Sequence, residues 1–293
     1  MRKAMQAVVR ETIRSHEDTA LLLIDIGVYP FRDLLEQYPE RAKNIGIFEA
    51  GTISLAAGLS LSGITPIVYG ISPFLVQRAL EQLKLGFVYQ KTGGNFITTG
   101  AAYDFSTLGY SHYCPEDVAT LRLLPGMEIL TPGTPEQFTT LFRTCCLNGN
   151  PSYFRMTDHS CKTQVPVAFG NAAVIKRGTR ATVIAAAEQL DATLEACREL
   201  DVTILYYTTL APFDKQTLCR ELTGGKVFVS APFYSGSLYP EIVEAVGRQR
   251  IQIAGAEVPL KILRSYGTKE EKDKALELDA AGICGRLKVF LAS

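Results

Sequence analysis

Residues 44–82 read NIGIFEAGTISLAAGLSLSGITPIVYGISPFLVQRALEQ, and they carry the clearest indication of the fold class. It holds two short apolar runs, NIGIF (44–48) and PIVYG (66–70), and a helical pattern rich in Gly, Ala and Leu lies between them. A second helical pattern begins at Pro73 and continues to Gly86. Short apolar strands that alternate with helices predict an α/β fold whose strands run mainly parallel.

The same alternation extends in both directions from this stretch. Further strands are predicted at ALLLID (20–25), FITTGA (96–101), MEILTP (127–132) and SYFRM (152–156), and further helices at 116–124 and 134–149. The last helix has a start signal, with Thr134 as its N-cap and Glu136 in its first turn. Polar residues 158–166 predict a linker, after which strands are predicted at 181–187, 202–210, 226–232 and 251–257. We therefore expect two doubly wound α/β domains, residues 1–166 and 167–293.

The composition narrows the class of protein. Of the 293 residues 47% are hydrophobic, which excludes a disordered chain, and 30 Lys and Arg balance 30 Asp and Glu. A net charge of zero gives no reason to expect binding to nucleic acid or to an acidic membrane. No apolar run approaches the ~20 residues that span a bilayer. Seven cysteines without a C-x-x-C pair are typical of free thiols in a reducing cytoplasm, which is the expected location.

Two more stretches carry a resemblance to a known family. They are DFSTLGYSHYCPEDVATLRLLPGMEILTPGTPEQ (104–137) and RSYGTKEEKDKALELDAAGI (264–283). Together with residues 44–82, the first of them resembles the pyrimidine-binding domain of transketolases in order and spacing. The second is similar to the end of the same family's C-terminal domain. The likeness is greatest to the carboxy-terminal subunits of split, two-chain transketolases, and it covers nearly the whole chain.

This resemblance implies a site for the aminopyrimidine ring of thiamine diphosphate. Glu49 matches the glutamate that binds the ring nitrogen, where a proton-sharing carboxyl favours the imino tautomer needed for catalysis. Phe74 matches an aromatic that stacks on the ring and excludes water. Ile71 stands where the family often has a second Phe, so the apolar wall remains but one stacking surface is lost. The alternative interpretations are a carboxylate favoured by a helix N-terminus for Glu49 and a core aromatic for Phe74.

Substrate contacts are implied by the same likeness. His112, in G-Y-S-H, matches a histidine that faces the hydroxyls of the substrate and moves protons, and the alternative is a histidine of a surface loop. Leu108 replaces an Asp, and Gly100 replaces a second His, that contact the sugar in several members. The loss of both polar contacts points to a donor or acceptor unlike the usual pentose phosphates.

Two charged residues complete the expected site. Arg155 matches an arginine that holds the phosphate of a sugar substrate, a task to which a guanidinium is suited. The alternative is an edge-strand arginine paired with a carboxylate. Asp25 matches a strand-end Asp near the thiazolium ring, and the alternative is a helix cap. Arg78, Glu81 and Gln82 are expected on a subunit interface or a solvated face.

One motif of the family is missing from this sequence. Transketolases hold the diphosphate through Mg²⁺ with a G-D-G motif and a later Asn, and no G-D-G occurs here. The likeness therefore implies a partner, an amino-terminal transketolase subunit that binds the diphosphate and Mg²⁺, in a complex expected to be an α2β2 heterotetramer. That complex would transfer a two-carbon ketol unit from a sugar or ketose phosphate to an aldehyde. Two alternatives are the beta subunit of a 2-oxo-acid dehydrogenase and a non-catalytic assembly subunit.

Overall fold

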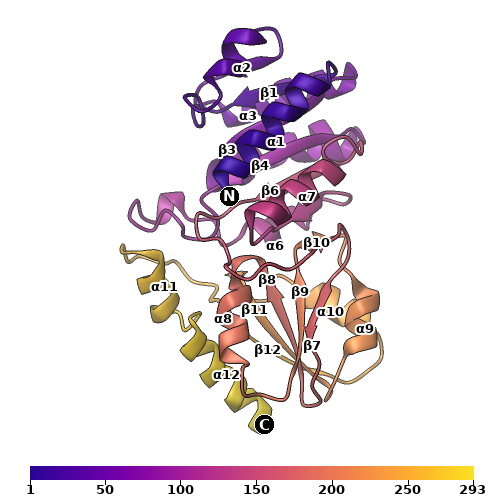
Figure 1. The fold of residues 1–293 in the computed structure, drawn as a ribbon, viewed down its shortest axis with the longest axis vertical. Helices are drawn as coiled ribbons and strands as arrows, with labels where there is room; N and C mark the ends of the chain where they lie inside the picture. Colours follow the sequence, from indigo (N-terminus) through magenta and orange to yellow (C-terminus); the bar gives the residue numbers. More distant parts are fainter.

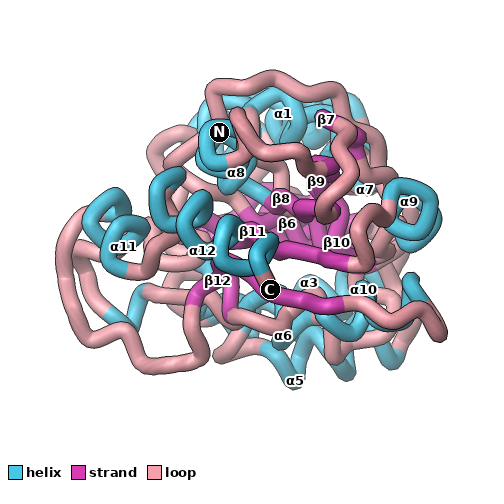
Figure 2. The backbone as a smooth tube through the Cα atoms, turned by 90° about the horizontal axis from the view of Figure 1, so that it is seen from below, coloured by secondary structure: helices cyan, strands magenta, loops and turns pink.

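Two separate sheets organise the chain. The computed structural model describes residues 1–293 and places a seven-stranded sheet above a five-stranded sheet, each flanked by helices (Figure 1). Seen from below, the strands form the centre of the molecule and the helices its outside (Figure 2). The expected fold class, two α/β domains, is confirmed.

The first sheet has the strand order β10-β5-β6-β4-β3-β1-β2. Its strands are β1 (Thr19–Leu23), β2 (Ala42–Asn44), β3 (Thr65–Ile71), β4 (Gly94–Thr99), β5 (Glu128–Leu130), β6 (Pro151–Arg155) and β10 (Thr209–Ala211). All neighbours pair in parallel except β10, which is antiparallel to β5. Because β2, β1, β3 and β4 are adjacent and parallel, the loops that follow them gather at one edge of the sheet.

Helices cover both faces of this sheet. They are α1 (Arg2–Ser15), α2 (Arg32–Gln37), α3 (Glu49–Leu61), α4 (Ser72–Val76), α5 (Leu80–Leu83), a π-helical turn (Lys84–Tyr89), α6 (Asp117–Leu121) and α7 (Pro135–Cys145). Side chains alternate along β1, so that Leu21 and Leu23 pack toward α1 and α7 whereas Leu22 packs toward α3. The predicted cap of α7 is confirmed, since the Thr134 hydroxyl accepts from the backbone N–H of Gln137 at 3.3 Å.

The second sheet has the order β12-β11-β8-β9-β7. Its strands are β7 (Ala173–Lys176), β8 (Thr182–Ala186), β9 (Thr203–Tyr207), β11 (Lys226–Tyr234) and β12 (Gln252–Val258), and only β7 is antiparallel. Its helices are α8 (Leu190–Ala196), α9 (Lys215–Glu221), α10 (Tyr239–Val246), α11 (Lys269–Ala275) and α12 (Ala280–Ala292). We keep residue 166 as the proposed boundary, although β10 of the second half joins the first sheet.

One of the hydrophobic clusters crosses the junction between the two domains. Val68 and Phe96 of the first sheet and Val229 of the second belong to a single cluster of 32 buried residues. A charged side chain also crosses the junction, because Arg122 donates to Glu241 at 2.5 Å. The domains are therefore joined by apolar packing and by hydrogen bonds.

Several local predictions need correction. NIGIF (44–48) is not a strand, because β2 ends at Asn44 and the chain turns at Gly46 with φ +82°. Ile47 and Phe48 are 72% and 62% exposed, so their apolar character does not mark a buried strand. The helix predicted from residue 73 to residue 86 is broken into α4, α5 and the π-helical turn. The helix α1 and the strand β7 have no counterpart among the predicted elements, and the strand predicted at 202–210 is divided into β9 and β10.

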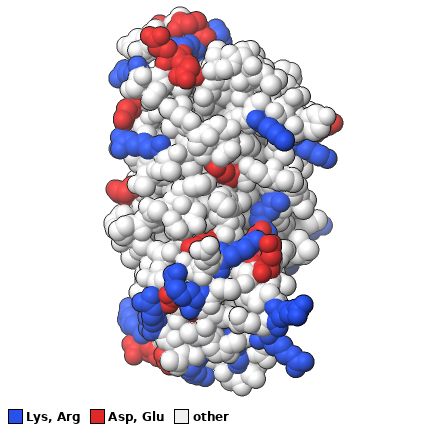
Figure 3. Space-filling model, turned by 90° about the vertical axis from the view of Figure 1, so that its right-hand side faces the viewer, with Lys and Arg blue, Asp and Glu red and all other residues white.

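The surface of the protein carries charges of both signs. Figure 3 shows Lys and Arg interspersed with Asp and Glu on one face, with a broad uncharged area in its upper half. None of the helices has the length and apolarity that a membrane crossing requires.

Candidate active site

Glu49 is a buried acid at the start of a helix. It is the first residue of α3, only 3% exposed, and the loop before it is fixed by Asn44, whose side-chain oxygen accepts from the backbone N–H of Gly46 at 3.3 Å. The Glu49 carboxylate has one charged partner, Arg78, whose Nη1 donates to Oε2 at 2.8 Å. A helix N-terminus also favours negative charge. The burial of this carboxylate is thus offset by an ion pair and by the helix dipole.

Phe74 lies beside this acid in the turn that follows β3. Ile71 ends β3 with extended backbone, and Pro73 in the first turn of α4 places the half-buried Phe74 on the side of Arg78. The guanidinium of Arg78 lies 4.6 Å from the centroid of the Phe74 ring, within the range of a cation–π contact. One arginine therefore contacts both the acid and the aromatic.

His112 reaches Phe74 from the loop after β4. It ends the 3₁₀ turn Tyr110–His112, is half-buried, and its ring meets Phe74 edge to face at 5.2 Å between centroids. Ser111 Oγ lies 3.0 Å from His112 Nδ1, which leaves Nε2 for other partners. Phe105 lies 6.4 Å from the imidazole, again between ring centroids. Thus the structure brings Glu49, Phe74 and His112 into one cluster, with Arg78 between the first two.

The two departures from the family pattern have different surroundings. Gly100 has φ +81°, and a Cβ built on it would lie 2.5 Å from the ring of Phe105. A larger residue there would need another backbone conformation, so the chain has no room for a histidine side chain at this point. Leu108 is 54% exposed on the same loop. It presents an apolar side chain at the position where several members of the resembled family have an Asp.

Asp25 lies at the same edge of the sheet, after β1. It is exposed, has φ 52°, and its backbone N–H and side chain bond to the side chain of Asn44 at 3.0 and 3.2 Å. The next helix, α2, begins only at Arg32, so Asp25 is not a helix cap. No hydrogen bond joins it to Glu49 or His112.

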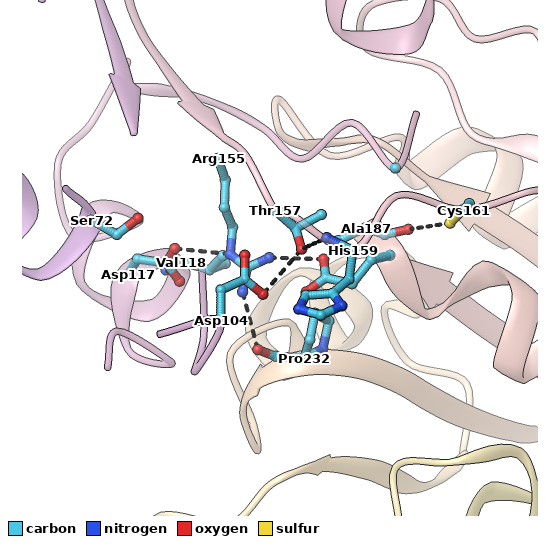
Figure 4. Close-up of polar contacts among 12 residues, drawn as sticks. Ser72, Asp104, Asp117, Val118, Arg155, Thr157, His159, Cys161, Ala187 and Pro232 are labelled. Carbon is cyan, nitrogen blue, oxygen red and sulfur yellow. Dashed lines mark hydrogen bonds and ion pairs between the residues drawn. The ribbon is translucent and has the colours of Figure 1, made fainter. Parts of the chain in front are cut away.

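Arg155 is not placed to bind a substrate phosphate. It is 1% exposed and lies in the junction between the domains (Figure 4). Its Nε donates to Asp117 at 2.9 Å, its Nη1 to Glu188 at 3.1 Å and its Nη2 to the carbonyl of Pro232 at 3.1 Å. The carboxylate pairing of the alternative interpretation is present, but β6 lies between β5 and β4 and is not an edge strand. Burial nevertheless raises the pKa of Asp117, against the opposing effect of Arg155.

A second acid lies next to this junction. Asp104 accepts from Thr157 Oγ1 at 3.1 Å and from the backbone N–H of Asp158 at 2.9 Å (Figure 4). Burial, and then the negative charge of Glu188, raise the pKa of Asp104 to about 7. Glu188 Oε1 is buried without a hydrogen-bond partner.

Two arginines near the site are not among the expected site residues. Arg78 is expected on an interface or a solvated face, yet it lies in the turn after α4, where its guanidinium contacts both Phe74 and Glu49. Arg2 carries no signal in the sequence, although its guanidinium lies 5.9 Å from the Phe105 ring, pairs with Asp158 at 2.6 Å and has a buried Nε without a partner.

The structure holds no cluster of three or more His, Cys, Asp or Glu side chains that could bind a metal.

Comparison with known proteins assigns the family. Residues 1–162, more than half of the chain, match the family described as "Transketolase, pyrimidine binding domain". The chain belongs to the transketolase family. The expected family is therefore confirmed.

Relatives of similar length extend this assignment. An uncharacterized 33.6 kDa protein in the fasciation locus of Rhodococcoides fascians is 31% identical over 275 residues, which are 92% of this chain and 88% of that one. One of the subunits of apulose-4-phosphate transketolase from Phocaeicola vulgatus is 26% identical, over 97% of this chain and 95% of its own. A solved structure described as a split gene transketolase, inactive beta4 tetramer, has a TM-score of 0.84 at 22% identity and covers 99% of this chain and 97% of its own, which shows the same fold.

Proposed function

We propose that this chain is the carboxy-terminal subunit of a two-chain transketolase, which transfers a two-carbon ketol unit from a ketose-like donor to an aldehyde acceptor. The observation that carries this proposal is the cluster of Glu49, Phe74 and His112, a buried acid and an aromatic beside a histidine. The relative from Phocaeicola vulgatus, a transketolase subunit that this chain matches over nearly its full length, supports the two-chain form.

The residues fit one end of thiamine diphosphate. A buried carboxylate with one oxygen not bonded to Arg78 suits a ring nitrogen that must share a proton, and Phe74 with Ile71 offers an apolar wall for a flat ring. Asp25 follows β1, which lies between β2 and β3, and it is proposed to lie toward the thiazolium ring of the cofactor. The bound cofactor would supply an electron sink for the cleaved carbon–carbon bond.

His112 and its loop are proposed to face the substrate. With Nδ1 next to the Ser111 hydroxyl, Nε2 is the atom that would exchange a proton with a substrate hydroxyl. Gly100 and Leu108 would leave that side of the site less polar than in sugar-binding relatives. Because Arg155 is buried in the junction, Arg2 is the proposed cation for a substrate phosphate.

A partner chain is proposed to complete the site with the diphosphate and Mg²⁺ ligands. Exposed apolar side chains lie just before Glu49, on α3 and on the π-helical turn, and we call them the α3 surface: Ile47, Phe48, Leu55, Leu61, Leu85 and Tyr89, all 45–75% exposed. A helix that is apolar on every side is typical of a helix buried between chains. This supports assembly over the α3 surface, with an α2β2 heterotetramer as the proposed form.

The first experiment is co-purification of this chain with its presumed partner, followed by calorimetric titration with thiamine diphosphate and Mg²⁺. We expect tight, metal-dependent binding by the pair and none by the lone chain. Tight binding by the lone chain would contradict the shared site. No binding by either would favour the non-catalytic assembly subunit.

Substrate identity is tested next on the assembled pair. A panel of phosphorylated and unphosphorylated ketoses is offered with a common aldehyde acceptor, and product formation is measured. We expect a preference for a donor other than the usual pentose phosphates, because Leu108 and Gly100 replace two polar contacts. A strong preference for xylulose 5-phosphate would refute that part of the proposal.

A further inference from the structure

Arg78 joins the three parts of the candidate site. Its Nη1 bonds to Oε2 of Glu49 at 2.8 Å, and its guanidinium stacks on Phe74 at 4.6 Å. Phe74 in turn packs against His112 at 5.2 Å. Arg78 itself is 50% exposed on its side chain, whereas the Glu49 side chain is 4% exposed. The half-exposed Arg78 thus binds the buried Glu49 from the side that faces solvent.

We infer that Arg78 is a positioning residue for Glu49. A carboxylate has two oxygens, and a donor fixed on Oε2 orients the plane of the group and leaves Oε1 to bind the ring nitrogen of the cofactor. A planar guanidinium can hold the carboxylate and stack on the aromatic at once, which a lysine cannot do. This inference rests on the proposed function.

The alternative is that Arg78 competes with the cofactor for Glu49, and it predicts the opposite change in cofactor affinity. In that case the guanidinium pairs with the Glu49 carboxylate in the lone chain, and this pair must break before the cofactor can bind to Glu49. Removal of Arg78 would then strengthen cofactor binding, whereas removal of a positioning residue weakens it. The direction of the change separates the two possibilities.

The experiment measures thiamine diphosphate affinity of the assembled pair by calorimetry for wild type, Arg78→Ala and Arg78→Lys. A charge-assisted hydrogen bond predicts a loss of about tenfold to a hundredfold in affinity for Arg78→Ala and a smaller loss for Arg78→Lys. Millimolar guanidinium should restore affinity to Arg78→Ala, because the position is open to solvent. The control is Arg143→Ala, which breaks an exposed 2.8 Å pair with Glu11 and should leave affinity unchanged.

A second pair of variants tests whether Arg78 acts through Glu49. In a Glu49→Gln background, addition of Arg78→Ala should change cofactor affinity by less than about threefold, since coupled residues are not additive. This double variant also removes both charges and so avoids an unpaired buried carboxylate. The KM for the ketose donor should change little in Arg78→Ala, while the cofactor affinity falls.

The outcomes are distinct. Unchanged or tighter cofactor binding in Arg78→Ala, or a full effect in the Glu49→Gln background, refutes the positioning role while the proposed function stands. A loss in Arg78→Ala that guanidinium and Arg78→Lys both fail to restore also refutes it. A wild-type pair that does not bind the cofactor refutes the proposed function and this inference with it.

Discussion

Replacement of Arg155 by methionine should destabilise the protein without altering substrate affinity. Arg155 has no exposed side-chain surface, and its three hydrogen bonds reach Asp117 in the first domain and Glu188 and Pro232 in the second. Methionine keeps much of the volume but provides no donor. The variant therefore leaves two buried carboxylates without their cation.

The expected decrease in the free energy of unfolding follows from the loss of this cation. Removal of one partner from a buried ion pair costs about 3–5 kcal/mol, because the remaining charge is desolvated and unpaired. Asp117 retains bonds from Tyr153 and from the backbone N–H of Val118, which lowers the cost, whereas Glu188 loses its hydrogen bond from Arg155, which raises it, so the expected cost lies within that range. Since burial already raises the pKa of Asp117, and loss of Arg155 raises it further, the cost should be smaller at pH 5 than at pH 8.

The assay is urea unfolding of the chain followed by circular dichroism, with Michaelis kinetics of the assembled pair in parallel. The exposed pair of Arg143 and Glu11 provides the control, because Arg143→Ala should cost no more than about 1 kcal/mol. A change below about 1 kcal/mol for Arg155→Met, together with a KM increase confined to phosphorylated donors, would refute the structural role. That result would restore Arg155 as a phosphate ligand.

Three further changes test other parts of the structure. Glu49→Ala should abolish turnover of the assembled pair and leave assembly intact by size-exclusion chromatography; wild-type rates in this variant would exclude the proposed role. Leu55→Glu places a charge on the α3 surface and should weaken association by at least about tenfold in analytical ultracentrifugation, whereas unchanged association would place the interface elsewhere. Burial raises the pKa of Glu257 from 4.5 to about 7, so the native state holds a proton that the unfolded chain releases. Its contribution to stability is therefore full below pH 4.5 and is lost as the pH rises to 7, by up to about 3 kcal/mol. Glu257→Gln should reduce this dependence of the free energy of unfolding on pH, measured by urea unfolding below, within and above that pH range. An unchanged pH dependence would mean that other groups cause it.

The arrangement of the sheets could be predicted because it depends on local patterns. The five-residue strand β1 and the longer β3 are apolar runs bounded by polar residues, and the first sheet buries both of its faces. Strand order then places the residues after β2, β3 and β4 at one edge, so Glu49, Phe74 and His112 could be grouped without knowledge of their contacts. Their likeness to a known motif supplied the expected roles.

What could not be predicted depends on partners distant in sequence. NIGIF is mistaken for a strand because an exposed apolar surface and a buried strand have the same composition. The buried ion pairs of Arg155 could not be predicted because its carboxylates lie 38 residues before it and 33 after it, and no local signal marks either one. Arg78 differs, since its spacing from Phe74 is visible in the sequence, but the pairing with Glu49 spans 29 residues.

The second domain helps to hold the loop that carries His112. Tyr113, next to His112, donates from its hydroxyl to the carbonyls of Ser106 and Ser265, both at 3.0 Å. Lys272 of α11 bonds to Ser265 and lies 5.1 Å from the Tyr113 ring, so the segment before α11 is itself held in place. Tyr113, which follows His112, is thus held both by Ser106 of its own domain and by Ser265, which lies 152 positions after it. Because a proton-transfer group must be held within a fraction of an ångström, the proposed role of His112 makes residues 265–272 a structural requirement of the proposed site.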